Sequence, residues 1–223
     1  MVRTKRLVLN KNCFMYINMS SYEDKLLFKD EQDYKFFYKF FKQSFKREGI
    51  KILHYCFLPD QIDVVCKKFR NSDLGRLTKS LALSYFVYYK QKYDDPSRLW
   101  GERYKSLLIE NEFYSLLAGI VIERKPEVFD TYRFSSYRYY AYGIKDMAVK
   151  KNSYYKKFGE KELEKQELYR NVFVDPFVVN QRYLKALRYL GSDEFIEKME
   201  KRFRVKNTKV SRIKDVELNK AFE

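Results

Sequence analysis

Residues 51–67, KILHYCFLPDQIDVVCK, decide the fold of this chain. Two runs rich in β-branched and aromatic residues, 51–58 and 61–67, stand on either side of the dipeptide Pro59–Asp60. This pattern predicts two antiparallel strands joined by a tight turn. The other elements can be placed outward from this hairpin.

A helix is predicted on each side of the hairpin. The upstream helix begins at Asp30, a suitable N-cap residue, and ends before residue 49, a glycine. The downstream helix is predicted over 72–93. Strands over 6–17 and 99–110 complete the order β-α-β-β-α-β. That order is typical of an α+β fold of the ferredoxin-like kind, an antiparallel sheet with helices on one face.

The chain beyond this unit is predicted to be helical. A third helix, 111–124, would lie against the sheet. From about residue 146 the sequence becomes charged and loses any strand signal. We therefore expect two parts, a ferredoxin-like domain over 1–145 and a C-terminal helical extension with a basic tail over 146–223.

Charge is the dominant property of the composition. The 223 residues include 46 Lys and Arg against 30 Asp and Glu, a formal net charge of +16, which suits phosphate contacts. Four lysines at helical spacing in the first predicted helix form a stripe: Lys35, Lys39, Lys42 and Lys46. Such a stripe can follow a nucleic-acid backbone, although it is more often a solvated helix face.

Cysteine usage and hydropathy limit the class of protein. Cys13, Cys56 and Cys66 show no Cys-x-x-Cys spacing, which argues against a disulfide framework or a cysteine zinc site. No stretch approaches the roughly 20 apolar residues that a membrane span needs. A soluble, cytoplasmic protein is expected.

Four segments, in this order, resemble one known family. They are FKDEQDY at 28–34, LWGERYKSLLIENEFY at 99–114, YRFSSYRYYAYG at 132–143 and LGSDEFIEKMEKRF at 190–203. Together they resemble the REP-associated tyrosine transposases, which are single-tyrosine transposases of the HUH type. The resemblance spans nearly the whole chain, with Phe134 where the family usually has Trp.

The resemblance implies a fold and a reaction. In that family two histidines of a Pro-Asn-His-x-His segment hold a Mg²⁺ or Mn²⁺ ion, and a polar residue completes the metal site. A helix supplies a tyrosine that attacks a backbone phosphate and forms a covalent DNA adduct. The metal polarises the phosphate, and the tyrosine carries the strand through the intermediate.

This sequence departs from the family at each of those positions. Gln61 and Asp63 stand where the two histidines belong, and the only histidine of the chain is His54. Val121 stands at the position of the tyrosine, and Lys125 at that of the third metal ligand. The resemblance therefore predicts a transposase relative with no catalytic residues, no metal site and no cofactor. Tyr114, two helical turns before Val121, would lie roughly 10 Å from the attacking position.

The substitutions themselves motivate a sharper hypothesis. Asp63 lies on one face of its strand, and Val121 and Lys125 share a helix face at spacing four. In the geometry of the family, Asp63 and Lys125 would meet where the metal ion would be. We expect the Lys125 ammonium to replace the cation and pair with Asp63, although both side chains could instead face solvent. His54, a lone strand histidine, is predicted to be a hydrogen-bonded structural residue.

DNA is the expected partner, as a hairpin or a single strand. The candidate phosphate contacts are Arg103, Lys105, Arg133 and Arg138. The candidate rings for base stacking are Tyr137 and Tyr140. Three alternatives stay open: an active transposase that cuts through a displaced site, an RNA-binding or protein-interaction module on the same fold, and an element relic without function. The oligomeric state is not predicted.

Overall fold

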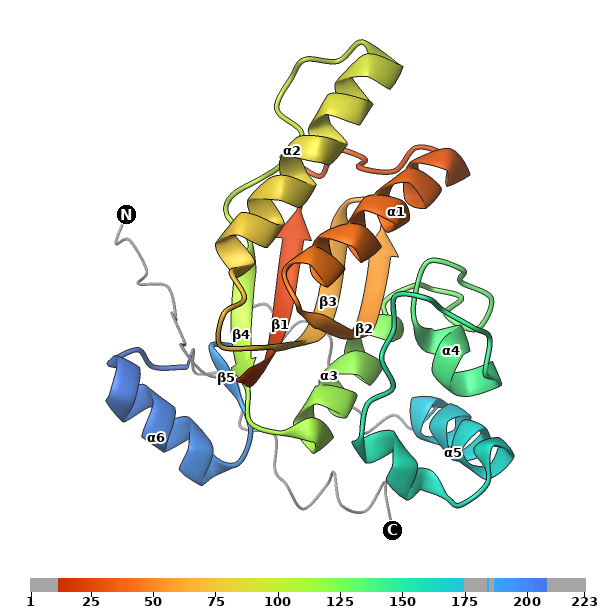
Figure 1. Cartoon of the computed structure of the whole chain (residues 1–223), viewed down its shortest axis with the longest axis vertical. Coiled ribbons are helices and arrows are strands. Elements are labelled where there is room, and N and C mark those ends of the chain that lie inside the picture. Colours follow the sequence, from red (N-terminus) through yellow and green to blue (C-terminus); the bar gives the residue numbers. More distant parts are fainter. Residues whose placement is uncertain (1–11, 175–183, 185–186, 208–223) are drawn as a thin grey trace.

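The computed structural model describes residues 12–174, 184 and 187–207. Its centre is a five-stranded sheet with the order β2-β3-β1-β4-β5 (Figure 1). The strands are β1 (Cys13–Ser20), β2 (Lys51–Leu58), β3 (Gln61–Lys68), β4 (Lys105–Ile109) and β5 (Tyr189–Leu190). The pairs β2–β3, β3–β1 and β1–β4 are antiparallel, so the predicted ferredoxin-like arrangement is confirmed. The short β5 pairs parallel with β4, so the sheet is mixed rather than purely antiparallel.

Six α-helices and one 3₁₀ turn surround the sheet in the described part of the chain. They are α1 (Glu31–Arg47), α2 (Leu74–Tyr93), α3 (Glu112–Glu123), α4 (Tyr137–Tyr142), the 3₁₀ turn (Tyr154–Phe158), α5 (Glu162–Val174) and α6 (Asp193–Phe203). Short polar side chains begin several of these helices, as expected for N-caps. Asp30 forms a capping box with Asp33 at α1, Asn111 caps α3, and Ser192 caps α6.

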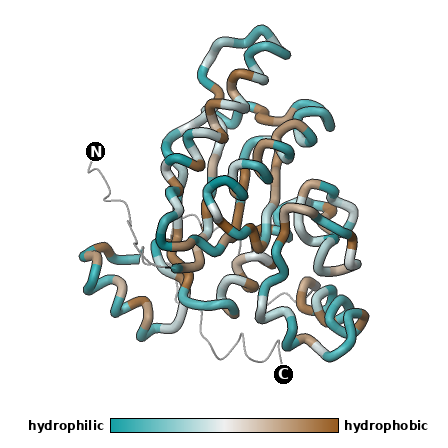
Figure 2. The backbone as a smooth tube through the Cα atoms, viewed as in Figure 1, coloured by the Kyte–Doolittle hydropathy of each residue, from teal (hydrophilic) through white to brown (hydrophobic). Residues whose placement is uncertain are grey.

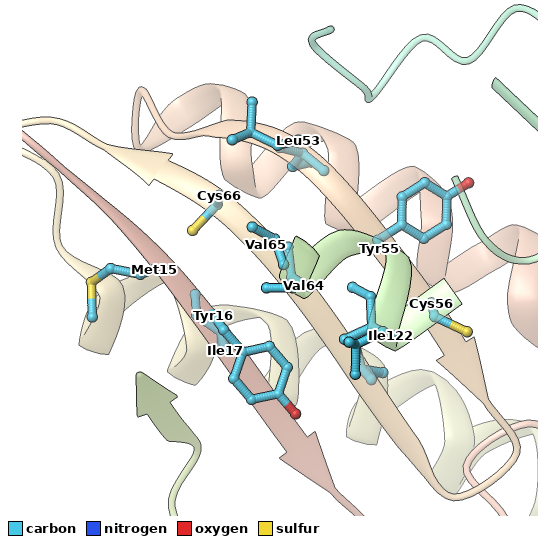
Figure 3. Close-up of a cluster of buried hydrophobic side chains, with 14 of the residues drawn as sticks. Met15, Tyr16, Ile17, Leu53, Tyr55, Cys56, Val64, Val65, Cys66 and Ile122 are labelled. Atoms are coloured by element: carbon cyan, nitrogen blue, oxygen red, sulfur yellow. The ribbon is translucent and has the colours of Figure 1, made fainter. Parts of the chain in front are cut away.

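The two faces of the sheet are covered by different helices. Ile17 and Val64 line a common gap with residues of α1 and α2, so these two helices cover one face, and they lie side by side in Figure 1. The other face of β1, β2 and β3 packs against α3, whose backbone at residue 119 lies directly against the ring of His54 in β2. The prediction of helices on one face therefore holds for α1 and α2 only. The second face carries large apolar side chains, and α3 buries them (Figure 3).

Two predicted strands differ from the observed ones. The first was expected over 6–17, but β1 ends at Ser20, and residues 6–11 lie outside the described residues. The strand predicted over 99–110 shortens to β4, and Trp100 forms only an isolated bridge with Ser21. At Gly101 a Cβ atom would lie 2.6 Å from the Ser21 carbonyl oxygen. The backbones of residues 101 and 21 therefore approach too closely for a residue with a side chain at position 101.

The C-terminal extension packs directly on the ferredoxin-like unit. Val149 bridges to Ile52 at the free edge of β2, and β5 extends the opposite edge of the sheet. Hydrophobic residues concentrate along the strands and the inner sides of the helices (Figure 2). The boundary at 145/146 stays a prediction, and the tail beyond residue 207 lies outside the described residues. Among the described helices, none has both the length and the apolar character needed to cross a membrane.

Candidate functional site

Asp63 is the centre of a buried polar group on the α3 face of the sheet. The Lys125 Nζ lies 2.6 Å from Asp63 Oδ2, and the two side chains are 7% and 0% exposed. The other carboxylate oxygen accepts hydrogen bonds from the Tyr16 hydroxyl at 2.6 Å and from Asn18 Nδ2 at 3.0 Å. The expected pair of Asp63 and Lys125 is therefore present, and Asp63 has three donors.

Strand register and helix length bring these residues together. Asn18 of β1 is the direct partner of Asp63 of β3, so their side chains share one face. Lys125 follows the last turn of α3, where its backbone N–H donates to the Ile122 carbonyl oxygen. The Asn111 side chain caps the N-terminus of α3, and the length of the helix from there determines where Lys125 lies over the sheet.

The surroundings of Asp63 keep the Tyr16 hydroxyl and the Cys56 thiol protonated. Burial, together with the charge of Asp63 and the hydrogen bond to it, raises the pKa of the Tyr16 hydroxyl well above its ordinary value. Burial and the Asp63 charge likewise raise the pKa of the Cys56 thiol. Neither group is ionised near neutral pH, so neither is an activated nucleophile.

The remaining positions of the predicted site carry no reactive group. Val121 is 1% exposed and apolar, and it belongs to the hydrophobic core. Gln61 is buried, and its Oε1 accepts no hydrogen bond from the described residues. Tyr114 lies in the first turn of α3 and is also buried, far along the helix from Lys125. A displaced tyrosine nucleophile at Tyr114 is not supported by this geometry.

The donor set does not fit a Mg²⁺ or Mn²⁺ ion. Such ions prefer about six oxygen ligands, and Asp63 is the single carboxylate of this group. Its oxygens already accept from Tyr16, Asn18 and Lys125, and the Lys125 ammonium would repel a second cation. Across the described residues, no group of three or more His, Cys, Asp and Glu side chains is arranged to hold a metal.

A second buried polar group surrounds His54. The His54 Nδ1 lies 2.9 Å from Glu123 Oε1, and both side chains are fully buried. Glu123 also accepts from the Ser136 hydroxyl and, at 2.7 Å, from the Tyr169 hydroxyl of α5. Burial and the Glu123 charge raise the pKa of Tyr169 well above its ordinary value. The structural role predicted for His54 is confirmed, but its partners were not predicted. Glu123 is the charged residue at the end of the apolar sequence of α3, and this unusual charge could have indicated a buried partner for His54.

The six predicted DNA-contact residues separate into two groups. Arg103, Lys105 and Arg133 are exposed and Arg138 is half-buried, and none of these four forms an ion pair within the described part of the chain. Lys105 is the register partner of Asn18, so it lies on the same face as Asp63. The Arg133 segment lies at the β2 edge instead, where the Phe134 carbonyl accepts from the Phe57 N–H.

The two tyrosines predicted to stack on bases are both buried. Tyr137 is 2% exposed and packs against Phe173 with ring centroids 4.3 Å apart. Tyr140 is fully buried, stacks on His54 at 4.5 Å and donates to the Leu53 carbonyl. The burial of these two rings argues against base stacking, because Tyr137 packs on α5 and Tyr140 on His54 of β2.

Comparison with known proteins identifies the fold. No protein-family model matches this sequence, and no curated protein does. The solved structure of a REP-associated tyrosine transposase bound to a REP hairpin is similar, with a TM-score of 0.54 and 12% sequence identity, covering 67% of this chain and 92% of that one. A Deinococcus radiodurans R1 protein assigned as a transposase has a TM-score of 0.38 at 10% identity, covering 52% of this chain and 92% of that one, a likeness too low to support an argument. The chain therefore has the fold of a REP-associated tyrosine transposase.

Proposed function

We propose that this protein binds hairpin or single-stranded DNA and does not cut it. The observation that carries the proposal is the buried ion pair between Asp63 and Lys125, two residues that the family resemblance aligns with metal ligands. The fold supports the DNA-binding half of the proposal, since the similar solved structure is bound to a REP hairpin.

The loss of chemistry follows from what the pair can and cannot do. Metal-assisted phosphate cleavage needs a cation that can take up a phosphate oxygen at an open coordination position. The Lys125 ammonium is 7% exposed and already holds Asp63, so it cannot approach a phosphate without leaving a buried carboxylate unpaired. The position of the attacking tyrosine is occupied by buried Val121, which has no nucleophilic atom.

Binding does not depend on that chemistry. The net charge of +16 attracts a polyanion, and the exposed side chains of Arg103, Lys105 and Arg133 are available for phosphate contacts. Lys105 adjoins the buried pair through Asn18, so a strand held there would pass over the altered site without reacting. The role we propose is that of a binding protein on the scaffold of an enzyme.

The cleavage test uses labelled single-stranded DNA that carries the hairpins flanking the gene. The protein is added with Mn²⁺ or Mg²⁺, and the mixture is divided between a native gel and a denaturing gel. We expect a shifted complex on the native gel and intact, free DNA after denaturation. Label that stays on the denatured protein, or shortened strands, would show an active transposase and overturn the proposal.

A binding test separates specific contacts from total charge. The variant R103Q/K105Q/R133Q is compared with K35Q/K39Q/K42Q, which removes the same three charges from α1. We expect the first variant to bind the hairpin DNA at least tenfold more weakly and the second to change affinity by less than threefold. Equal losses, or tighter binding to an RNA of the same sequence, would contradict a DNA-binding surface at this site.

A further inference from the structure

Two lysines oppose each other directly at the end of the β2–β3 ladder. Lys51 of β2 and Lys67 of β3 are register partners. Like charges directly opposite on neighbouring strands are destabilising. Lys67 follows Asp63 by four residues on the same face of β3, about 13 Å along the strand. The pair is thus a separate feature from the ion pair at Asp63.

Two further lysines belong to segments that pack near this pair. The backbone N–H of Lys150 donates to the Ile52 carbonyl oxygen at 2.8 Å, which places Lys150 next to the beginning of β2. The Lys157 ammonium lies 4.7 Å from the Tyr154 ring, and that ring lies 5.0 Å from the ring of Phe113. Phe113 follows Glu112, the residue that approaches Lys67. We call Lys51, Lys67, Lys150 and Lys157 the lysine cluster.

Acidic side chains do not neutralise the cluster. Glu112 is the one carboxylate that forms an ion pair with a cluster lysine within the described residues, at 3.8 Å from Lys67. The nearby Glu162 already pairs with Lys151 at 2.8 Å and with Lys165 at 3.0 Å. Lys51, Lys150 and Lys157 are exposed and form no ion pair in the described part of the chain.

Aromatic rings hold most of the ammonium groups in place. The Lys51 Nζ lies 5.3 Å from the Phe69 ring, and the Lys67 Nζ lies 4.8 Å from the Phe14 ring. Lys157 is held over Tyr154 in the same way. A cation positioned over a ring has already lost part of its rotamer freedom. Ordering these side chains on an anionic partner therefore requires less further loss of entropy.

We propose that the lysine cluster is a second DNA contact, which binds the phosphate backbone without reading sequence. Neighbouring strands lie about 4.8 Å apart, a spacing of the same order as that between successive phosphates. A run of phosphates can therefore contact several lysines of the cluster together, whereas one small anion could bridge only Lys51 and Lys67. This inference rests on the proposed DNA binding and adds a surface on which the family resemblance places no residue.

The experiment measures affinity and its salt dependence for a 30-nucleotide single strand of mixed sequence. The wild-type protein is compared with K51Q/K67Q/K150Q/K157Q and with K35Q/K39Q/K42Q/K46Q, which removes four charges from α1. Thermal melting of all three proteins checks that the variants are folded. We expect the cluster variant to bind at least tenfold more weakly at 150 mM salt, and its slope of log K against log salt to be shallower by about 2 to 3.

The outcomes distinguish the two proposals. Strong binding by the wild type with equal losses in both four-lysine variants would show a general charge effect and overturn the lysine cluster as a site. Unchanged slope in the cluster variant would overturn it as well. If the wild-type protein itself does not bind DNA, the proposed function fails, and the cluster fails with it. A tenfold preference of the wild type for RNA of the same sequence would overturn DNA as the occupant.

Discussion

The charged residues at the two ends of β3 lie in opposite environments. Near its beginning, Asp63 is fully buried and is neutralised by Lys125, with Tyr16 and Asn18 completing its hydrogen bonds. At its end, Lys67 faces Lys51 across the ladder, and Lys51, Lys150 and Lys157 are exposed. One strand thus carries a buried charge that is neutralised inside the protein and a charge beside a lysine that is available to a partner.

The difference separates charges that serve the fold from charges available to a partner. A buried ion must find its counterion inside the protein, because water cannot solvate it there. An exposed ion needs no internal counterion, and a like-charged pair causes a small loss of stability that an anionic partner can offset. The substitutions below test whether the two ends differ in this way.

The largest expected effect comes from breaking the buried pair. The variant K125M leaves the Asp63 carboxylate buried without a counterion, and we expect the free energy of unfolding to fall by about 3–5 kcal/mol. Urea denaturation measures this change. The double variant D63N/K125M should regain most of the stability, and K150M, at an exposed lysine of the cluster, should change it by less than about 0.5 kcal/mol. A loss below about 1 kcal/mol in K125M would show that the pair is solvated.

A smaller effect is expected from the hydroxyl that completes the same group. The variant Y16F removes the hydrogen bond to the buried Asp63 carboxylate, and we expect a loss of about 1.5–3 kcal/mol in urea denaturation. The matched control is Y142F, since Tyr142 donates to Asp130 in the same way but at an exposed position. Equal effects of the two substitutions would mean that burial does not distinguish this hydrogen bond.

At the end of β3 that carries Lys67, a charge reversal should stabilise the protein slightly. The variant K51E replaces the repulsion of Lys67 by an attraction, and we expect a gain of about 0.5 kcal/mol at low salt. The gain should fade in about 1 M salt because exposed charges are screened. Its salt dependence can be followed by urea denaturation at both salt concentrations. Destabilisation by K51E at low salt would show that the two lysines do not repel each other in the folded protein.

Divalent cations are expected to have almost no effect on stability. A site with a dissociation constant of about 10 μM would add about 2.7 kcal/mol at 1 mM Mn²⁺, which would raise the melting temperature by roughly 5–10 °C. The donor set around Asp63 does not fit such a site, so we expect a shift below about 1 °C by calorimetry. A saturable rise with Mn²⁺ that disappears in D63N would contradict the replacement of the metal by Lys125.

Local signals in the sequence predicted most of the fold. Asp30 and Ser192 cap the helices expected of them, and Pro59–Asp60 joins the two strands of the central hairpin. The family resemblance placed Asp63 opposite Lys125, because it supplied the position of the helix relative to the strand. The residue spacing within the strand or within the helix does not contain that information. In contrast, β5 could not be predicted, since a two-residue strand is defined only by its contacts with β4.

The sequence analysis failed where the same residue type is common both at the surface and in the core. Tyr137 and Tyr140 stand beside arginines, and the same local pattern describes a stacking surface or a buried packing layer. The rings of α5, which lies far along the chain, bury Tyr137 in the structure. The group around His54 was missed for the same reason, because Glu123, which pairs with His54, and Ser136 and Tyr169, which donate to Glu123, come from three separate segments.

The hydrogen bond from Tyr169 to Glu123 can form only late in the synthesis of the chain. Glu123 and Tyr169 are 46 residues apart, so at about 5–20 residues per second the carboxylate precedes its hydroxyl partner by roughly 2–9 s. During that interval His54 and Ser136 are the available partners of Glu123. The hydrogen bonds of this buried carboxylate are therefore completed only after α5 has been synthesised.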